Sequence, residues 1–334
     1  ANEVIHNYLT KFGSVLYELT RKYKKTLTAA MAHRTYAAPS TLGFKLAIHL
    51  NELDYLMRRL KEVGEFTFAG SLAGVEGLST MLGDHYEQVE ADFCQELDLS
   101  TPEMYWHTQR ERFTEYCNVL TMISQLLGKL GRNLLVMNQT QVGEFRETYA
   151  KGRQGSTVIP TVEEPYMCEA IVNLATIIRN EMPLMYDTMQ VTGEKDTTVW
   201  RDIYVVLPEM TMYLSGQLNY ATVVLSKGYF DTQRMSKNFE LDDGTMYSGA
   251  IMMALGKHIG RQNAHELLVR LRVESDVKGV LLKDLYYSDK EIAKYLSKGE
   301  LDDIMSPGNI LPHAVGKTDK ILRLYRQRHS DEIE

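Results

Sequence analysis

The segment Lys151–Pro165 carries the hydroxyl that is best placed to react, that of Ser156. Apolar residues recur at helical spacing on both sides of this segment, and two Gly and two Pro interrupt any helix within it. A hydroxyl on a loop of this composition can close over a bound ligand and become reactive only when closed. The alternative is that Ser156 caps the turn that follows it in an ordinary connection between helices.

Other patterns that resemble known sites fail on their spacing. Gly316-Lys-Thr318 ends like a phosphate-binding loop, but Leu311 stands where such a loop needs a glycine. His258 and His265 share a helix face without a carboxylate at metal-binding spacing. Two aspartate pairs lie in turns without EF-hand spacing, at 242–243 and 302–303. The sequence therefore implies no metal and no cofactor.

Charge and composition narrow the class of partner. The chain has 334 residues, a formal net charge of −7 and no clustered basic stripe, which disfavours nucleic acid. It contains no run of about 18 uncharged apolar residues, so no membrane span is predicted. Its three cysteines are odd in number and widely spaced, which fits reduced, buried thiols in a cytoplasmic protein. A small-molecule substrate is the remaining expectation.

Amphipathic helices are expected to position these residues. Apolar residues alternate between steps of three and four from Phe113 to Met137, the heptad pattern of a helix that packs against neighbours. Strand signals are weak, and the stretch 30–40, with His33 and Pro39, reads as a break. The periodicity predicts helices over 5–27, 42–63, 81–97, 109–138, 166–180 and 207–227.

Long heptad helices with short interruptions predict an all-α, elongated helical bundle. Segments become shorter and more polar after residue 233, so we expect a central bundle domain over 1–233 and a small helical domain over 234–334. Apolar stripes on several helix sides favour pairing with other subunits, and a homo-oligomer is expected.

Four ordered segments carry a family resemblance that covers nearly the whole chain. They are similar to segments of the aspartase/fumarase superfamily, most of all to its bacterial 3-carboxy-cis,cis-muconate cycloisomerase branch, with adenylosuccinate lyase next. The fingerprint loop of the superfamily reads Gly-Ser-Ser-x-Met-Pro-x-Lys-x-Asn-Pro, and 155–165 resembles it in degenerate form. The four segments are 32–43, 106–144, 155–165 and 234–266.

The resemblance implies a homotetramer whose central helices form a twenty-helix core, with each active site built from three subunits. It also implies that an N-terminal domain is missing before Ala1. By position, Ser156 corresponds to the serine that takes a proton next to a carboxylate, and His33 to a histidine that assists the leaving group. The same comparison implies substrate-binding roles for four further residues: Thr157, Gln109, Arg110 and Asn238.

Two departures from the family pattern reverse the charge of the loop. Val162 stands in place of the family lysine and Glu164 in place of its asparagine, so two groups that grip a substrate carboxylate are replaced. Two hypotheses follow. The chain is a diverged lyase or cycloisomerase that makes or breaks a C–X bond with Ser156 as the base, or it is a catalytically silent homologue with a structural or binding role.

Overall fold

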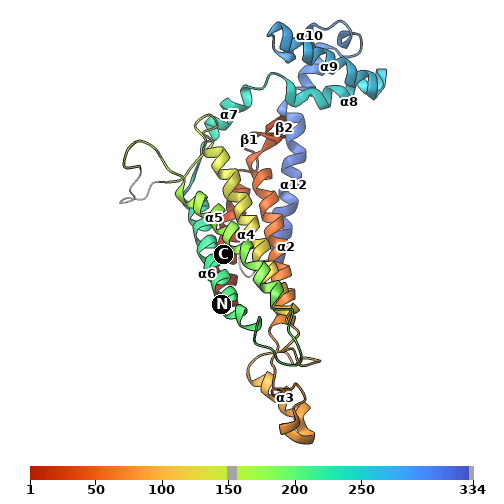
Figure 1. Ribbon diagram of the computed structural model, residues 1–334. Coiled ribbons are helices and arrows are strands. Elements are labelled where there is room, and N and C mark those ends of the chain that lie inside the picture. Colours follow the sequence, from red (N-terminus) through yellow and green to blue (C-terminus); the bar gives the residue numbers. More distant parts are fainter. Residues whose placement is uncertain (149–155, 331–334) are drawn as a thin grey trace.

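The computed structural model describes residues 1–148 and 156–330 and shows an elongated bundle of long helices (Figure 1). Short helices gather at one end of the bundle, and α3 (Tyr86–Glu96) lies at the other. The predicted all-α fold with an elongated bundle is therefore confirmed. The long helices of the bundle are α1 (Asn2–Lys22), α2 (Leu42–Thr67), α4 (Glu111–Asn138), α5 (Tyr166–Asp187) and α6 (Ile203–Lys227).

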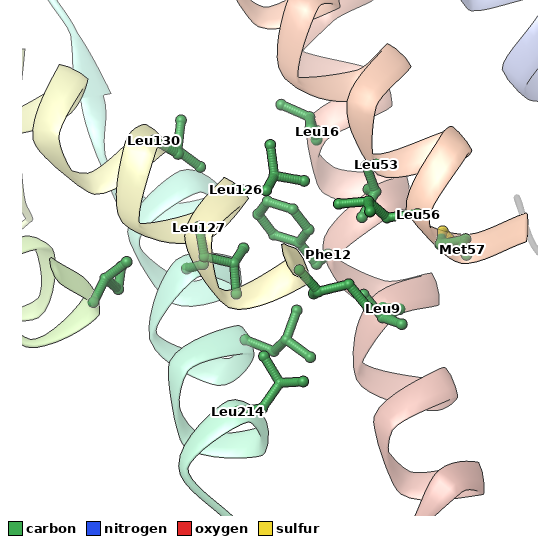
Figure 2. Close-up of a cluster of buried hydrophobic side chains, with 14 of the residues drawn as sticks. Leu9, Phe12, Leu16, Leu53, Leu56, Met57, Leu126, Leu127, Leu130 and Leu214 are labelled. Carbon is green, nitrogen blue, oxygen red and sulfur yellow. The ribbon is translucent and has the colours of Figure 1, made fainter. Parts of the chain in front are cut away.

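The heptad leucines of α4 form the centre of the bundle core. Leu120, Leu127 and Leu130 are almost fully buried, as the periodicity predicts. Figure 2 shows Phe12 of α1 among side chains of neighbouring helices, including Leu53 of α2, Leu126 of α4 and Leu214 of α6. Burying a side chain of this size stabilises the fold by about 1.5–3 kcal/mol, so the core holds the helices in a fixed arrangement.

Two glycines of α4 allow α5 to approach closely. A Cβ on Gly128 would lie 2.6 Å from the Cβ of Ala175, and one on Gly131 would lie 3.1 Å from Ile171 Cγ2. Each glycine costs the helix about 1 kcal/mol relative to alanine. The close contact between the two helices offsets that cost.

A β-hairpin replaces the break that the sequence predicted around residues 30–40. Strands β1 (Leu27–Ala32) and β2 (Thr35–Thr41) pair antiparallel, with a shift of register between Ala30 and Met31. His33 and Arg34 form the two-residue turn, and both have positive φ (50° and 67°). The prediction of no strand pair was wrong here, because such turns are normally recognised by Gly or Asn at these positions. A second pair joins β3 (Phe145–Arg146) and β4 (Tyr229–Phe230).

The C-terminal part forms a second core and then returns to the bundle. The second core is built mainly from residues 239–301, and it also contains Ala29 of the hairpin. The last helix, α12 (Pro307–Arg328), packs along α2, and its Leu322 and Tyr325 belong to the bundle core. The division at residue 234 stays a prediction. The other helical elements are η1 (Thr80–His85), η2 (Trp200–Asp202), α7 (Thr232–Glu240), η3 (Thr245–Tyr247), α8 (Ser248–Ile259), α9 (Arg261–Lys278), α10 (Leu282–Ser288), η4 (Ile292–Lys294) and α11 (Lys298–Ile304).

Candidate active site

A pocket of about 740 Å³ lies at the hairpin end of the bundle. The hairpin, the first turns of α2, the end of α4, the segment 141–144 and α7 form its walls, and a volume of this size suits a small molecule. Its apolar lining includes Leu42, Leu130 and Phe230. Its polar and charged lining consists of Thr28, Arg34, Tyr36, Ser40, Lys45, His49, Lys129, Asn133, Gln141, Glu144 and Asn238.

Asn238 of α7 lines this pocket and holds the opposite wall in place. Its Nδ2 donates to the carbonyl oxygen of Val142 (2.8 Å) and to Oε1 of Glu144 (2.9 Å). Arg234 donates from Nε to the same Val142 carbonyl (3.0 Å) and from Nη2 to that of Gln141 (2.8 Å). The predicted residue Asn238 therefore reaches the pocket, but its amide is engaged by a buried carboxylate of the same chain.

Lys45, in the first turn of α2, contributes a basic side chain to the lining of the pocket. Its side chain is half-buried, and burial lowers the pKa of its ammonium group, while the nearby Glu144 raises it. Within residues 1–148 and 156–330, it forms no ion pair and no side-chain hydrogen bond. Sequence reasoning missed Lys45, which lies between Phe44 and Leu46 and four residues before His49. A lysine one helical turn before a histidine, at the start of a largely apolar helix, was the available signal.

His49 lies one turn further along α2 and is buried. Its Nε2 lies 3.3 Å from Nδ2 of Asn133, which donates to it. Burial, and next the positive charge of Lys129, lower the pKa of His49 to about 4, so the imidazole is neutral at pH 7. Lys129 itself pairs with Glu52. In the described part of the chain, Nδ1 of His49 has no hydrogen-bond partner.

The hairpin turn brings a different residue to the pocket from the one predicted. His33 is exposed at the tip and does not line the pocket, whereas Arg34 and Tyr36 do. Burial and the charges of Glu144 and Asp242 raise the pKa of Tyr36, while Arg234 opposes that rise. The catalytic role of His33 stays a prediction.

Ser156 and Thr157 lie on the segment before α5 and are not among the residues that line this pocket. The Oγ atom of Ser156 accepts hydrogen bonds from the backbone N–H groups of Ile159 (3.1 Å) and Val158 (3.4 Å). This is the capping geometry that was the alternative to catalysis. Thr157 is exposed. The first part of the predicted loop, 151–155, lies outside the described residues.

Gln109 and Arg110 lie at the opposite end of α4. A helix of 28 residues is about 42 Å long, so these two residues are far from the pocket in the same chain. Gln109 is exposed, but Arg110 is buried, with its guanidinium 4.7 Å from the ring centroid of Phe113 and 5.7 Å from that of Trp200. Burial lowers the pKa of Arg110 to about 10. A single chain therefore does not bring all the predicted site residues together.

A second, wider groove of about 940 Å³ lies between α1, α2 and the end of α12. Three of its basic residues are held by Asp54: Arg328, His329 (Nε2–Oδ1 3.0 Å) and Arg58 (Nε–Oδ2 3.6 Å). Because Asp54 already pairs with these residues, Lys61 is the other lysine or arginine in the lining of this groove, whereas the pocket at the hairpin offers both Arg34 and Lys45.

Comparison with known proteins agrees with this architecture. Residues 1–179 match the family described as lyase, and residues 244–321 match the one described as adenylosuccinate lyase C-terminus. The chain belongs to the aspartase/fumarase superfamily. The first match contains the hairpin, α2 and α4, which supply most of the pocket lining, whereas α7 with Asn238 lies between the two matches.

Superfamily relatives are lyases and cycloisomerases. The N-acetyl-S-(2-succino)cysteine lyase of Dickeya dadantii is 31% identical over 308 residues, covering 92% of this chain and 68% of the relative. The 3-carboxy-cis,cis-muconate cycloisomerase of Pseudomonas aeruginosa is 29% identical over 94% of this chain and 68% of its own. A solved structure, the 3-carboxy-cis,cis-muconate lactonizing enzyme of Pseudomonas putida, superposes with a TM-score of 0.86 at 27% identity, covering 98% of this chain and 73% of that one.

A membrane-spanning helix and a cluster of metal-ligating side chains are two features that would point to further partners. Across residues 1–148 and 156–330, no helix is long and apolar enough to cross a membrane. The same residues contain no group of three or more His, Cys, Asp or Glu side chains that could hold a metal ion. All three cysteines are buried, and none of them forms a disulfide within the described residues, as the sequence predicted.

Proposed function

We propose that this chain is a lyase or cycloisomerase that makes or breaks a C–X bond next to a carboxyl group of a small-molecule substrate. The observation that carries the proposal is the similarity to a named lyase over 92% of the chain. The pocket at the hairpin supports it, because its lining combines apolar walls with Arg34 and Lys45, which suit a carboxylated molecule.

The proposed reaction starts with removal of a proton from the carbon next to the carboxylate. Ser156, as its alkoxide, would take that proton while the electrons form a C=C bond and the C–X bond breaks. His33 would return a proton to the leaving group X. Because proton removal builds further negative charge on the carboxylate, the step requires hydrogen-bond donors or cations held near it.

The assembly proposed with this function is a homotetramer of cytoplasmic location. Within one chain, Arg110 and the pocket lie at opposite ends of α4, so antiparallel pairing of two bundles would bring them together. Large apolar side chains are exposed on α5 and α6, which supports pairing through these helices. They include Ile177, Leu184, Tyr186, Tyr204, Val205 and Met212.

The test of the activity is a change in ultraviolet absorbance: a rise when a thioether substrate releases an unsaturated dicarboxylate, or a fall when a conjugated diene cyclises to a lactone. Two substrates should be tried with the wild-type protein and with Ser156→Ala: an S-(2-succino) thioether and 3-carboxy-cis,cis-muconate. We expect turnover of one of them and a loss of about 100-fold or more in kcat for Ser156→Ala. Thr161→Ala, a change of another exposed loop hydroxyl, is the matched control. Absence of turnover of both compounds by the wild-type protein would favour the silent homologue instead.

The test of the shared site is complementation between two inactive variants. We propose in addition that Ser156 and Arg110 reach one site from different subunits, so Ser156→Ala and Arg110→Met each remove a residue supplied by a different chain. Mixed tetramers should then contain some sites with both wild-type residues and recover part of the activity. If mixed tetramers form but recover no activity, the proposal that different subunits share one site is contradicted.

A further inference from the structure

We propose that Lys45 is the residue that binds the substrate carboxylate in this pocket, supplying from α2 the cation that the loop lacks at Val162. This inference rests on the proposed function, since it names the anchor for the carboxylate that the reaction requires. Val162 is exposed and uncharged, and Glu163 and Glu164 beside it add negative charge to the loop. A carboxylate that enters the site must therefore find its cation elsewhere.

The other basic groups around the pocket are already engaged or lie at its edge. Lys129 pairs with Glu52, and Arg234 donates to the backbone carbonyls of Gln141 and Val142. Arg34 is exposed at the hairpin turn. Lys45 is half-buried, lines the pocket and has no ion pair among residues 1–148 and 156–330. It is thus the inward-lying cation that is available to a ligand.

Glu144 does not neutralise Lys45 in this arrangement. The Glu144 carboxylate is buried and accepts a hydrogen bond from Asn238, and within the described ranges no ion pair joins it to Lys45. Its negative charge nevertheless lies close enough to raise the pKa of the Lys45 ammonium group against the effect of burial. A bound carboxylate would act in the same direction, so it would stabilise the charged lysine and be held by it.

The lining also restricts the class of ligand. Leu42, Leu46 and Leu130 line the same pocket as the lysine, so hydrocarbon next to the carboxylate is accommodated. Arg34 at the mouth of the pocket offers a second positive charge. The arrangement suits a dicarboxylate with a short hydrocarbon link better than a cationic or uncharged molecule.

Binding of fumarate, measured by isothermal titration calorimetry, tests the assignment without requiring turnover. The variants are Lys45→Met, which removes the charge, and Lys45→Arg, which keeps it. We expect Lys45→Met to raise the Kd for fumarate by about tenfold or more, and Lys45→Arg to stay within about threefold of the wild-type protein. Lys237→Met, at an exposed α7 position outside the pocket lining, should leave the Kd unchanged. Fumaramide, the uncharged analogue, should show no dependence on Lys45.

The outcomes separate this assignment from the proposed function. Fumarate binding that depends on Lys45, without turnover of either substrate, would support the assignment and contradict the activity. Turnover that is unchanged in Lys45→Met, or fumarate binding that is unchanged, would overturn the assignment and leave the activity standing. A wild-type protein that does not bind fumarate would also overturn it. Thermal unfolding of each variant shows whether a loss of binding reflects a loss of folding.

Discussion

The side-chain amide of Asn238 donates a hydrogen bond to the carboxylate of Glu144, with 2.9 Å between Nδ2 and Oε1, across 94 positions of the chain. Glu144 follows α4, and Asn238 lies in α7, so the bond ties the end of the central bundle to the start of the C-terminal part. A substrate that uses the Asn238 amide must compete with Glu144 for it.

Replacing Asn238 should destabilise the fold as well as alter the pocket. Asn238→Ala leaves the buried Glu144 without this donor, which we expect to cost about 1–3 kcal/mol in the free energy of unfolding. Urea unfolding followed by circular dichroism measures that cost. Asn263→Ala, which removes an exposed amide on α9, should change it by less than about 0.5 kcal/mol. Equal effects from the two changes would show that the bond to Glu144 contributes little.

Asp54 should anchor the C-terminal end of α12 in a pH-dependent way. Burial opposes ionisation of Asp54, but the hydrogen bond from His329 and the charge of Arg328 together hold its pKa below the ordinary value of 3.8. A lowered pKa gives stability that is present above pH 3.8 and is lost as the pH falls below it. Asp54→Asn should therefore cost about 2 kcal/mol at pH 7 and less at pH 3.

The control for Asp54 is Glu62→Gln on the same helix. Glu62 pairs with Arg59 on the exposed surface, and such pairs contribute about 0–1 kcal/mol. Thermal unfolding at pH 7 and pH 3 compares the two variants with the wild-type protein. A cost of Asp54→Asn that is the same at both pH values would contradict the pH dependence.

His49 should make the protein less stable as the pH falls from 6.5 towards 4. Its pKa is about 4 in the folded chain, against 6.5 for an unperturbed histidine, so the unfolded chain binds more protons in this range. The resulting loss of stability reaches about 2 kcal/mol at pH 5 relative to pH 7. His49→Gln removes the titrating group, so its free energy of unfolding should change less between these pH values. Parallel losses in both proteins would show that other groups dominate.

Gly128 should resist replacement although it lies inside a helix. A Cβ at this position would lie 2.6 Å from the Cβ of Ala175, so α4 and α5 must move apart. The overpacking exceeds the gain in helix propensity of about 1 kcal/mol, so we expect Gly128→Ala to lower the free energy of unfolding by about 1–2 kcal/mol in net terms. A Cβ added to Gly316 of α12 would have no neighbouring atom of the described residues within 4 Å, so Gly316→Ala should stabilise the protein by about 0.5–1 kcal/mol. Thermal unfolding of both variants tests whether Gly128→Ala lowers the stability and Gly316→Ala raises it.

The sequence by itself determined the helices and the bundle. The heptad pattern from Phe113 to Met137 corresponds to α4, and most of its leucines are in the core. This is possible because helical periodicity depends on residues three or four positions apart, which remain neighbours in any long helix. The four ordered segments that resemble the superfamily were equally readable, and the comparisons confirm the kinship.

Only the tertiary structure decided which of the polar residues share a pocket. Lys45, Glu144 and Asn238 come from three distant parts of the chain, and no local pattern links them. The hairpin also depends on tertiary structure, because His33 and Arg34 adopt a turn with positive φ that their residue types do not favour. Helix periodicity fixes which face of each element is apolar, but the packing of those faces against one another determines which polar side chains meet.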